Sequence, residues 1–235
     1  MPPATQGRNL KGLGSIMKKG KRVLFAGVLL LVLFAIWTLL IQTVDVQPAG
    51  ETGTEIGFAT LNCRFHTATG VHMTIYYITD WLGLIPVVVC ILFGGIGLVQ
   101  LLRRKSLFKV DLDIRLLGLY YGIVILWYLF FERFPVNYRP ILIEGFQEAS
   151  YPSSTTLLVL SVMPTLVLQG NRRLQSKVCK EMLGILTSLF SLFTVTGRLL
   201  SGVHWVTDIV GAVLLSTGLF CMYKASVLLF CTQEK

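Results

Sequence analysis

Six apolar stretches separated by short polar segments constrain this sequence more than any other feature. Three of them are long enough to cross the hydrocarbon core of a bilayer as helices, which takes about 20 residues: 23–41, 82–102 and 206–223. Three shorter ones fit either a span or a buried core helix: 116–131, 155–169 and 182–196. We therefore predict an all-α integral membrane protein, a bundle of about six transmembrane helices, with five or seven left open.

The segment before the first apolar stretch differs from the rest of the chain. Residues 1–22 contain prolines, glycines and basic side chains without apolar periodicity, which predicts a disordered cytoplasmic tail. The stretch 23–41 exceeds a typical signal-peptide core, and no small-residue cleavage site follows it. We expect it to remain as an anchor, so that residues 23–235 form one membrane domain.

The basic residues predict the orientation in the membrane. If the N-terminus is cytoplasmic and the chain crosses six times, all but four of the 21 Lys and Arg residues fall on the cytoplasmic side. The four on the other side are Arg64, Arg133, Arg139 and Arg198. This asymmetry predicts a cell-membrane protein with both termini cytoplasmic. It also explains the net charge of +9 without nucleic acid, which we do not expect as a partner.

A histidine and an aspartate stand four positions apart at the start of the last apolar stretch. His204 and Asp208 share a face if a helix begins there. A carboxylate so placed accepts a hydrogen bond from one ring nitrogen and leaves the other free as a nucleophile. Arg198, six residues earlier, offers a forked cation for phosphate oxygens. A lone histidine is readily explained as a hydrogen-bonded interface residue, but ionisable groups at membrane depth are functional sites by default.

Two further polar segments flank the middle stretches. Arg139 and Pro140 end the segment 132–140, and Ser153 and Ser154 precede the fourth stretch. Serines before an apolar run indicate a helix N-terminus, which either is simply capped or binds an anion. Under the predicted topology all three segments lie on the extracytoplasmic side. Together they describe a site for phosphoryl transfer through a phosphohistidine.

These segments resemble the three signature blocks of the type 2 phosphatidic acid phosphatase superfamily, over about residues 80–225. The third block reads Ser-Arg, five residues, His, three residues, Asp. Arg198, His204 and Asp208 match it, with Gly197 in place of Ser. The resemblance implies a six-helix membrane phosphatase with His204 as nucleophile and Asp208 as the residue that orients it.

The first two blocks match in part. In the first, Lys, six residues, Arg-Pro, the pair Arg139-Pro140 matches, Glu132 stands at the lysine position, and Arg133 is an adjacent substitute cation. In the second, Pro-Ser-Gly-His, the pair Pro152-Ser153 matches, and Ser154 and Thr155 replace Gly and His. The residues that the resemblance assigns to substrate binding are Arg139, Pro140, Ser153, Ser154, Thr155 and Arg198.

Thr155 is the departure with the largest chemical consequence. The family histidine at this position protonates the leaving oxygen, which a threonine cannot do near neutral pH. Either His66, His72 or Glu132 supplies the proton, or the leaving group needs none. A phosphate leaving from a diphosphate is already a stable anion, which favours a lipid diphosphate such as a polyprenyl diphosphate.

The predicted function is therefore a lipid phosphate or diphosphate phosphatase acting at the extracytoplasmic face. Its partners are the bilayer and a membrane lipid phosphate as substrate. We expect no metal and no organic cofactor, because the arginines neutralise phosphate charge. The alternative is a non-catalytic lipid-phosphate binder or carrier with a degenerate site.

Overall fold

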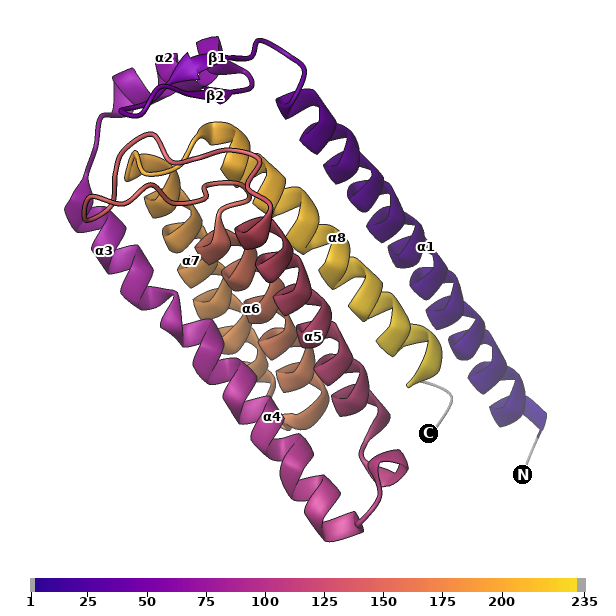
Figure 1. Cartoon of the computed structure of the whole chain (residues 1–235). Coiled ribbons are helices and arrows are strands. Elements are labelled where there is room, and N and C mark those ends of the chain that lie inside the picture. The colour runs from indigo at the N-terminus through magenta and orange to yellow at the C-terminus, as the bar shows by residue number, and fades with distance from the viewer. Residues whose placement is uncertain (1–2, 232–235) are drawn as a thin grey trace.

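The chain folds into a bundle of long helices with a small cap at one end (Figure 1). This computed structural model describes the backbone of residues 3–231 and the side chains of residues 14–231. The elements follow one another as α1 (Pro3–Ile41), β1 (Gln47–Ala49), β2 (Thr54–Ile56), α2 (Ala59–Thr69), α3 (Met73–Leu82), α4 (Leu84–Arg104), the short 3-10 helix η1 (Leu107–Lys109), α5 (Leu112–Arg133), α6 (Ser154–Arg173), α7 (Lys177–Leu200) and α8 (Val206–Phe230).

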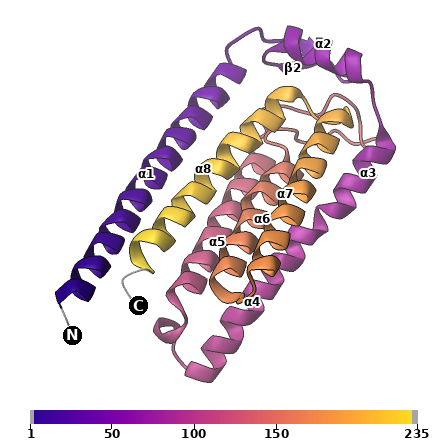
Figure 2. The same ribbon diagram turned by 180° about the vertical axis from the view of Figure 1, so that it is seen from behind.

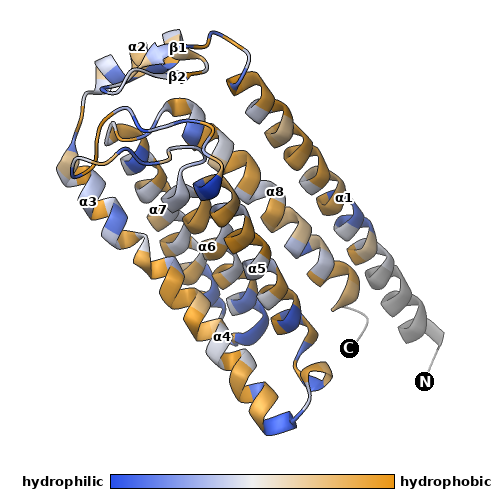
Figure 3. Cartoon of the chain, viewed as in Figure 1, coloured by the Kyte–Doolittle hydropathy of each residue, from blue (hydrophilic) through white to orange (hydrophobic). Residues whose placement is uncertain are grey.

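The long helices confirm the predicted all-α membrane bundle. Within the described residues, five stretches are long and apolar enough to cross a membrane: Gly14–Ile41, Met73–Arg104, Leu112–Arg133, Lys177–Leu200 and Val206–Phe230. Hydrophobic residues predominate along these helices (Figure 3). Many of them face outward, and Ile91, Leu126 and Leu192 are 66–67% exposed. An apolar outer surface of this kind requires lipid around it.

α6 completes the six helices of the bundle although its composition is more polar than that of the others. It packs against α7 and α8 and also contacts α4 and α5. Its buried polar side chains find partners on neighbouring helices: Thr165 pairs with the Tyr121 hydroxyl at 2.7 Å, and Gln169 donates to the Tyr223 hydroxyl at 2.6 Å. Because its neighbours shield it from lipid, α6 does not need an apolar surface.

α1 and α8 lie side by side and antiparallel in both views (Figures 1 and 2). Glycines allow the close approach. A Cβ atom on Gly27 would lie 3.1 Å from Cβ of Cys221, and one on Gly218 would lie 2.9 Å from Cδ2 of Leu31. The start of α1 and the end of α8 therefore lie at the same end of the bundle, as an even number of crossings requires.

The segment 1–22, for which the sequence predicts a disordered tail, belongs to α1 from Pro3 onward in the structure. α1 begins at Pro3 and continues through residue 22 without a break. Lys and Arg are good helix formers, so the basic residues 18–22 extend the helix of the apolar stretch. Residues 1–2 lie outside the described residues.

The cap consists of the β1–β2 hairpin and α2, and it covers the end of the bundle opposite the termini (Figure 1). The two strands pair antiparallel, with Gln47 opposite Ile56. Asn62 on α2 donates to the Thr207 hydroxyl at 3.0 Å, which ties the cap to the start of α8. The cap thereby holds the turn that precedes α8.

α3 and α4 form a nearly continuous helix interrupted at Gly83 (Figure 1). α3 crosses α7 very closely, because a Cβ atom on Gly197 would lie only 2.6 Å from Cγ2 of Thr79. A serine, which the family pattern has at this position, would not fit without moving α3 away. The departure at Gly197 is thus explained by the packing of α3 against the end of α7.

Candidate active site

His204 lies in the turn between α7 and α8, at the capped end of the bundle. It is buried, with 3% of its surface exposed. Its Nδ1 is 3.2 Å from the carbonyl oxygen of Ser150 and 3.3 Å from the Ser150 hydroxyl. Because a carbonyl oxygen can only accept, this contact places the proton on Nδ1. Nε2 has no hydrogen-bond partner. A neutral imidazole with a free Nε2 is suited to act as a nucleophile.

Asp208 lies in the first turn of α8 and is completely buried. It accepts hydrogen bonds from the Trp205 backbone N–H at 2.9 Å, from Asn137 Nδ2 at 3.2 Å and from the Ser150 hydroxyl. Its Oδ2 is 3.7 Å from Nδ1 of His204, too far for a direct hydrogen bond. The expected direct bond between the two is therefore replaced by a bridge, in which Ser150 contacts both side chains.

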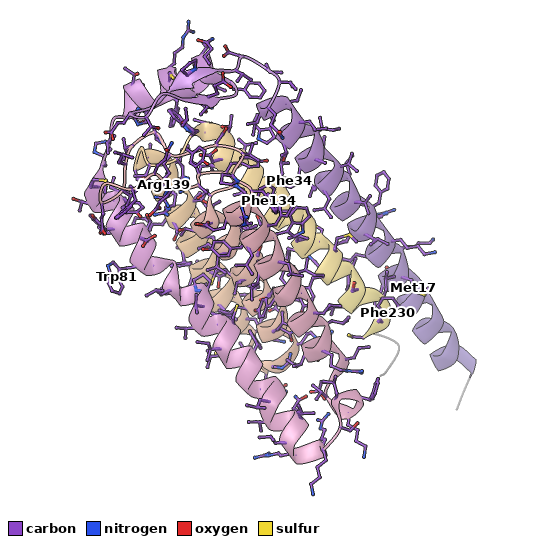
Figure 4. All side chains as sticks on the ribbon, in the orientation of Figure 1. Met17, Phe34, Trp81, Phe134, Arg139 and Phe230 are labelled. Carbon is purple, nitrogen blue, oxygen red and sulfur yellow. The ribbon has the colours of Figure 1, made fainter. Side chains whose placement is uncertain are left out.

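Arg139 follows α5 in a loop and Arg198 lies near the end of α7, and both are buried. Figure 4 labels Arg139 beneath the cap. The Tyr76 ring lies near both guanidinium groups, with its centroid 5.5 Å from Cζ of Arg139 and 4.8 Å from Cζ of Arg198. Nε and Nη1 of each arginine have no hydrogen-bond partner. Buried donors without hydrogen bonds are costly, so these four nitrogens form a candidate anion site.

Two carboxylates accompany the arginines. Glu148 Oε2 lies 2.9 Å from Nη2 of Arg139, and Asp80 Oδ1 lies 3.4 Å from Nη1 of Arg198.

The positive charges of the two arginines also affect the pKa of His204. Burial, followed by the charges of Arg139 and Arg198, holds the pKa of His204 well below its usual value of 6.5. The imidazole is therefore neutral at neutral pH.

The second-block residues open α6 as the sequence predicts. Ser153 is the buried N-cap residue, and its hydroxyl donates to the Thr156 hydroxyl at 3.1 Å. Ser154 lines both a cavity of about 280 Å³ beside Arg139 and a second cavity of about 360 Å³, and Thr155 lines only the second. The Ser153 hydroxyl is thus occupied by Thr156, whereas Ser154 and Thr155 border space that a ligand can occupy.

Pro140 contacts the cap through its backbone. Its carbonyl oxygen accepts a hydrogen bond from the Glu51 N–H at 2.9 Å, and Gly50 packs against its backbone. Pro140 is therefore placed to fix the loop that carries Arg139.

Four residues could replace missing family side chains, and they lie in different places: His66, His72, Glu132 and Arg133. His66 Nε2 contacts the Gly202 carbonyl oxygen at 3.1 Å, and His72 Nε2 contacts the Thr69 carbonyl oxygen at 2.9 Å. Neither histidine lines the two cavities. Glu132 does line the cavity beside Arg139, whereas the Arg133 guanidinium lies over the Phe134 ring. The geometry thus does not support Arg133 as the substitute cation.

Several residues of the site are not indicated by the sequence blocks: Tyr76, Asp80, Asn137, Glu148 and Ser150. Ser150 and Asn137 are linked to each other, since the Ser150 N–H donates to the Asn137 carbonyl oxygen at 2.9 Å. A weak signal for both was present, because each stands two or three residues before a matched block residue. Tyr76 and Asp80 carry no such signal, because they lie on α3, outside the three blocks.

A metal centre finds no support among residues 14–231, where no group of three or more His, Cys, Asp or Glu side chains is arranged to hold an ion. The charge complementary to phosphate in the described site comes from the two arginines.

Comparison with known proteins supports the reading of the three blocks. The family model of the PAP2 superfamily matches residues 130–229, which contain all three. The resemblance to the PAP2 superfamily is confirmed. The PAP2 region thus begins at the end of α5 and leaves α1 to α4 outside the match. A search of curated proteins found no match.

A solved structure extends the likeness to the whole fold. It is the crystal structure of the first transmembrane PAP2 type phosphatidylglycerolphosphate phosphatase from Bacillus subtilis. The two share 19% sequence identity with a TM-score of 0.63, and the match covers 89% of this chain and 97% of the other. The chain therefore has the fold of a transmembrane PAP2-type phosphatase, including the helices that precede the PAP2 region.

Proposed function

We propose that this protein is a lipid phosphate phosphatase that works through a phosphohistidine on Nε2 of His204. The observation that carries the proposal is the set of buried nitrogens that make no hydrogen bond: Nε2 of His204, and Nε and Nη1 of both Arg139 and Arg198, although Nη1 of Arg198 also lies 3.4 Å from Asp80. A phosphate group satisfies the four arginine N–H groups and presents phosphorus to the histidine.

The reaction follows from this arrangement in two steps. Nε2 of His204 attacks phosphorus, the P–N bond forms, and the P–O bond to the leaving group breaks with its electron pair going to that oxygen. Water then attacks the phosphohistidine, the P–N bond electrons return to Nε2, and inorganic phosphate is released. Arg139 and Arg198 hold the phosphoryl oxygens in both steps. The carbonyl of Ser150 and the carboxylate of Asp208 stabilise the positive charge that develops on the ring.

The N-terminus of α6 and the loop before it complete the proposed substrate site. Ser154 and Thr155 border the cavities and are assigned to substrate contact, together with the free N–H groups of the first turn of α6. Ser153 and Pro140 are proposed to support the site without contacting the substrate. Their polar groups are already hydrogen-bonded, to Thr156 and Glu51 respectively.

We propose that the site faces the extracytoplasmic side. The site lies at the capped end, whereas the termini lie at the opposite end (Figure 1). Basic side chains gather at that opposite end, in the last turns of α4 and α6: Arg103, Arg104, Arg172 and Arg173. The positive-inside rule therefore supports cytoplasmic termini and an extracytoplasmic site in the cell membrane.

The substrate class follows from the surroundings of the site. The outer surface requires lipid, and the cavity of about 360 Å³ extends from Asp80 along apolar side chains of α4, α5 and α6. A phosphate on a long hydrocarbon chain fits both features. Diphosphates such as polyprenyl diphosphates are the chemically easier substrates, because a departing phosphate is a stable anion.

The decisive experiment measures phosphate release and the covalent intermediate together. Purified protein should release inorganic phosphate from farnesyl diphosphate and should carry an acid-labile, base-stable phosphoryl group during turnover. His204→Ala should abolish both while the protein still inserts and keeps its thermal unfolding temperature. His72→Ala, the same change at an exposed histidine of the capped end, serves as the matched control. If wild type binds lipid phosphates through Arg139 and Arg198 but releases none, the protein is a binder or carrier.

A further inference from the structure

α3 brings two side chains to the site from outside the PAP2 region. Tyr76 and Asp80 are four residues apart on this helix and share a face. Both meet Arg198: the Tyr76 ring lies against its guanidinium group, and Asp80 Oδ1 lies 3.4 Å from its Nη1. Trp81, the next residue, points away from the bundle and is 72% exposed (Figure 4). α3 therefore presents Asp80 to the phosphate-binding groups.

Asp80 also lies beside the position where the family has its histidine. α3 ends at Gly83, where an added Cβ atom would lie 3.2 Å from Cγ2 of Thr155. Asp80 and Thr155 line the same cavity of about 360 Å³. The close crossing at Gly197 holds α3, which carries Asp80, against the end of α7. A carboxyl group thus reaches, from another helix, the region that Thr155 leaves without an acid.

The remaining wall of this cavity is mostly apolar. It is formed by Leu84, Val87, Val124, Ile125, Leu157 and Leu158. A lipid chain suits such a wall, whereas the phosphate suits Arg198. The leaving oxygen joins chain and phosphate, so it must lie at the boundary between the two environments. Asp80 stands at this boundary, with its side chain half exposed beside Arg198.

We propose that Asp80 is the general acid of the reaction and protonates the leaving oxygen in place of the histidine that Thr155 replaces. The inference rests on the proposed function. As the P–O bond breaks, the leaving oxygen takes the proton of the Asp80 carboxyl group and departs as an alcohol. When water attacks the phosphohistidine, the Asp80 carboxylate accepts the proton that water loses, so the carboxyl group is restored.

A purely structural role for Asp80 would lead to a different experimental result. If the carboxylate only held Arg198 in place, its loss would weaken phosphate binding to the same degree for every substrate. A general acid matters most for a poor leaving group. Two substrates with the same hydrocarbon chain separate these cases: farnesyl phosphate, whose leaving group is an alkoxide, and farnesyl diphosphate, whose leaving group is a phosphate.

The test compares Asp80→Asn with wild type on this pair. We expect kcat on farnesyl phosphate to fall about 10²- to 10⁴-fold, the usual contribution of a general acid, and kcat on farnesyl diphosphate to fall less than about tenfold. Adding Thr155→His to Asp80→Asn should restore much of the lost rate on farnesyl phosphate. Asp45→Asn, the same change at a partly exposed carboxylate of the capped end, should leave both rates unaltered.

The outcomes are distinct. Equal losses on both substrates, or unaltered rates on both, would overturn the assignment of Asp80 while leaving the phosphatase intact. Turnover of farnesyl diphosphate by the variant shows that it is folded, so a lost monoester rate cannot be attributed to unfolding. If wild type releases phosphate from neither substrate, the proposed function itself fails.

Discussion

The hydroxyl of Ser150 donates a hydrogen bond to the carboxylate of Asp208, and the same oxygen lies 3.3 Å from Nδ1 of His204. Ser150 thus connects two residues of the third signature block from a different part of the chain. Its backbone carbonyl oxygen contacts the same ring nitrogen. The orientation of His204 therefore depends on the loop that precedes α6 as well as on α8.

Ser150→Ala should lower kcat without abolishing it. The variant loses the hydroxyl bridge but keeps the carbonyl contact to His204. A hydrogen bond to a charged group contributes about 1.5–3 kcal/mol, so we expect a loss of roughly 10- to 100-fold with little change in KM. Steady-state kinetics on farnesyl diphosphate measures this, and Ser150→Thr, which retains a hydroxyl, should lose less. An unaltered kcat in Ser150→Ala would show that the bridge has no part in catalysis.

Asp208 has two separable roles. Its carboxylate accepts a hydrogen bond from the Trp205 N–H at the start of α8, and in the proposed mechanism its charge stabilises the His204 ring. Asp208→Ala should lower stability by about 1 kcal/mol through the lost cap, besides lowering the rate. Asp208→Asn keeps a good capping side chain, so it should unfold near the wild-type temperature and still turn over slowly. Loss of all turnover and of stability in Asp208→Asn would contradict this separation.

Gly197→Ser restores the family residue, yet we expect it to impair this protein. The new Cβ atom would meet Cγ2 of Thr79 at 2.6 Å and push α3 away from α7. Overpacking of this kind costs about 1–3 kcal/mol and moves Asp80 from the site. Thr79→Ser removes the clashing methyl group and should rescue both the unfolding temperature and the rate in the double variant. If Gly197→Ser alone is as stable and active as wild type, the crossing is not tight.

The pH dependence should reflect the lowered pKa of His204. Because burial and the two arginines disfavour the imidazolium, the nucleophile stays deprotonated at and below pH 6.5, and the acid limb of kcat/KM should not stem from a histidine titrating near 6.5. The unfolded chain takes up this proton near its usual pKa, whereas the folded chain does not. Stability is therefore expected to fall as the pH drops below 6.5, and His204→Gln should remove that part of the slope. An identical slope in the variant would refute this source of the pH dependence.

The orientation can be tested by labelling single cysteines in a variant whose five native cysteines are replaced. Phe146 lies 73% exposed in the loop between α5 and α6, and Lys177 lies 89% exposed by its side chain at the start of α7. A membrane-impermeant maleimide added to intact cells should label Phe146→Cys and spare Lys177→Cys until the cells are opened. The reverse pattern would place the site in the cytoplasm.

The sequence alone determined the bundle, because the partition of a long apolar helix into lipid depends on its own residues and not on its neighbours. It also determined the group formed by Arg198, His204 and Asp208, since these residues lie within a short segment around one turn. The apolar stretch at 155–169 was too short to distinguish a span from a buried core helix, for the complementary reason: a helix surrounded by others follows its packing partners rather than the lipid.

Only the tertiary structure decided which other groups meet this segment. Ser150 and Asn137 reach Asp208 because the loop between α5 and α6 folds over the start of α8. Asp80 reaches Arg198 because a glycine at 197 lets α3 approach α7. Such contacts arise between residues far apart in the sequence, and they depend on the fit of one helix surface against another. The proposed nucleophile was therefore visible in the sequence, whereas the candidate acid became visible only when the helices were packed.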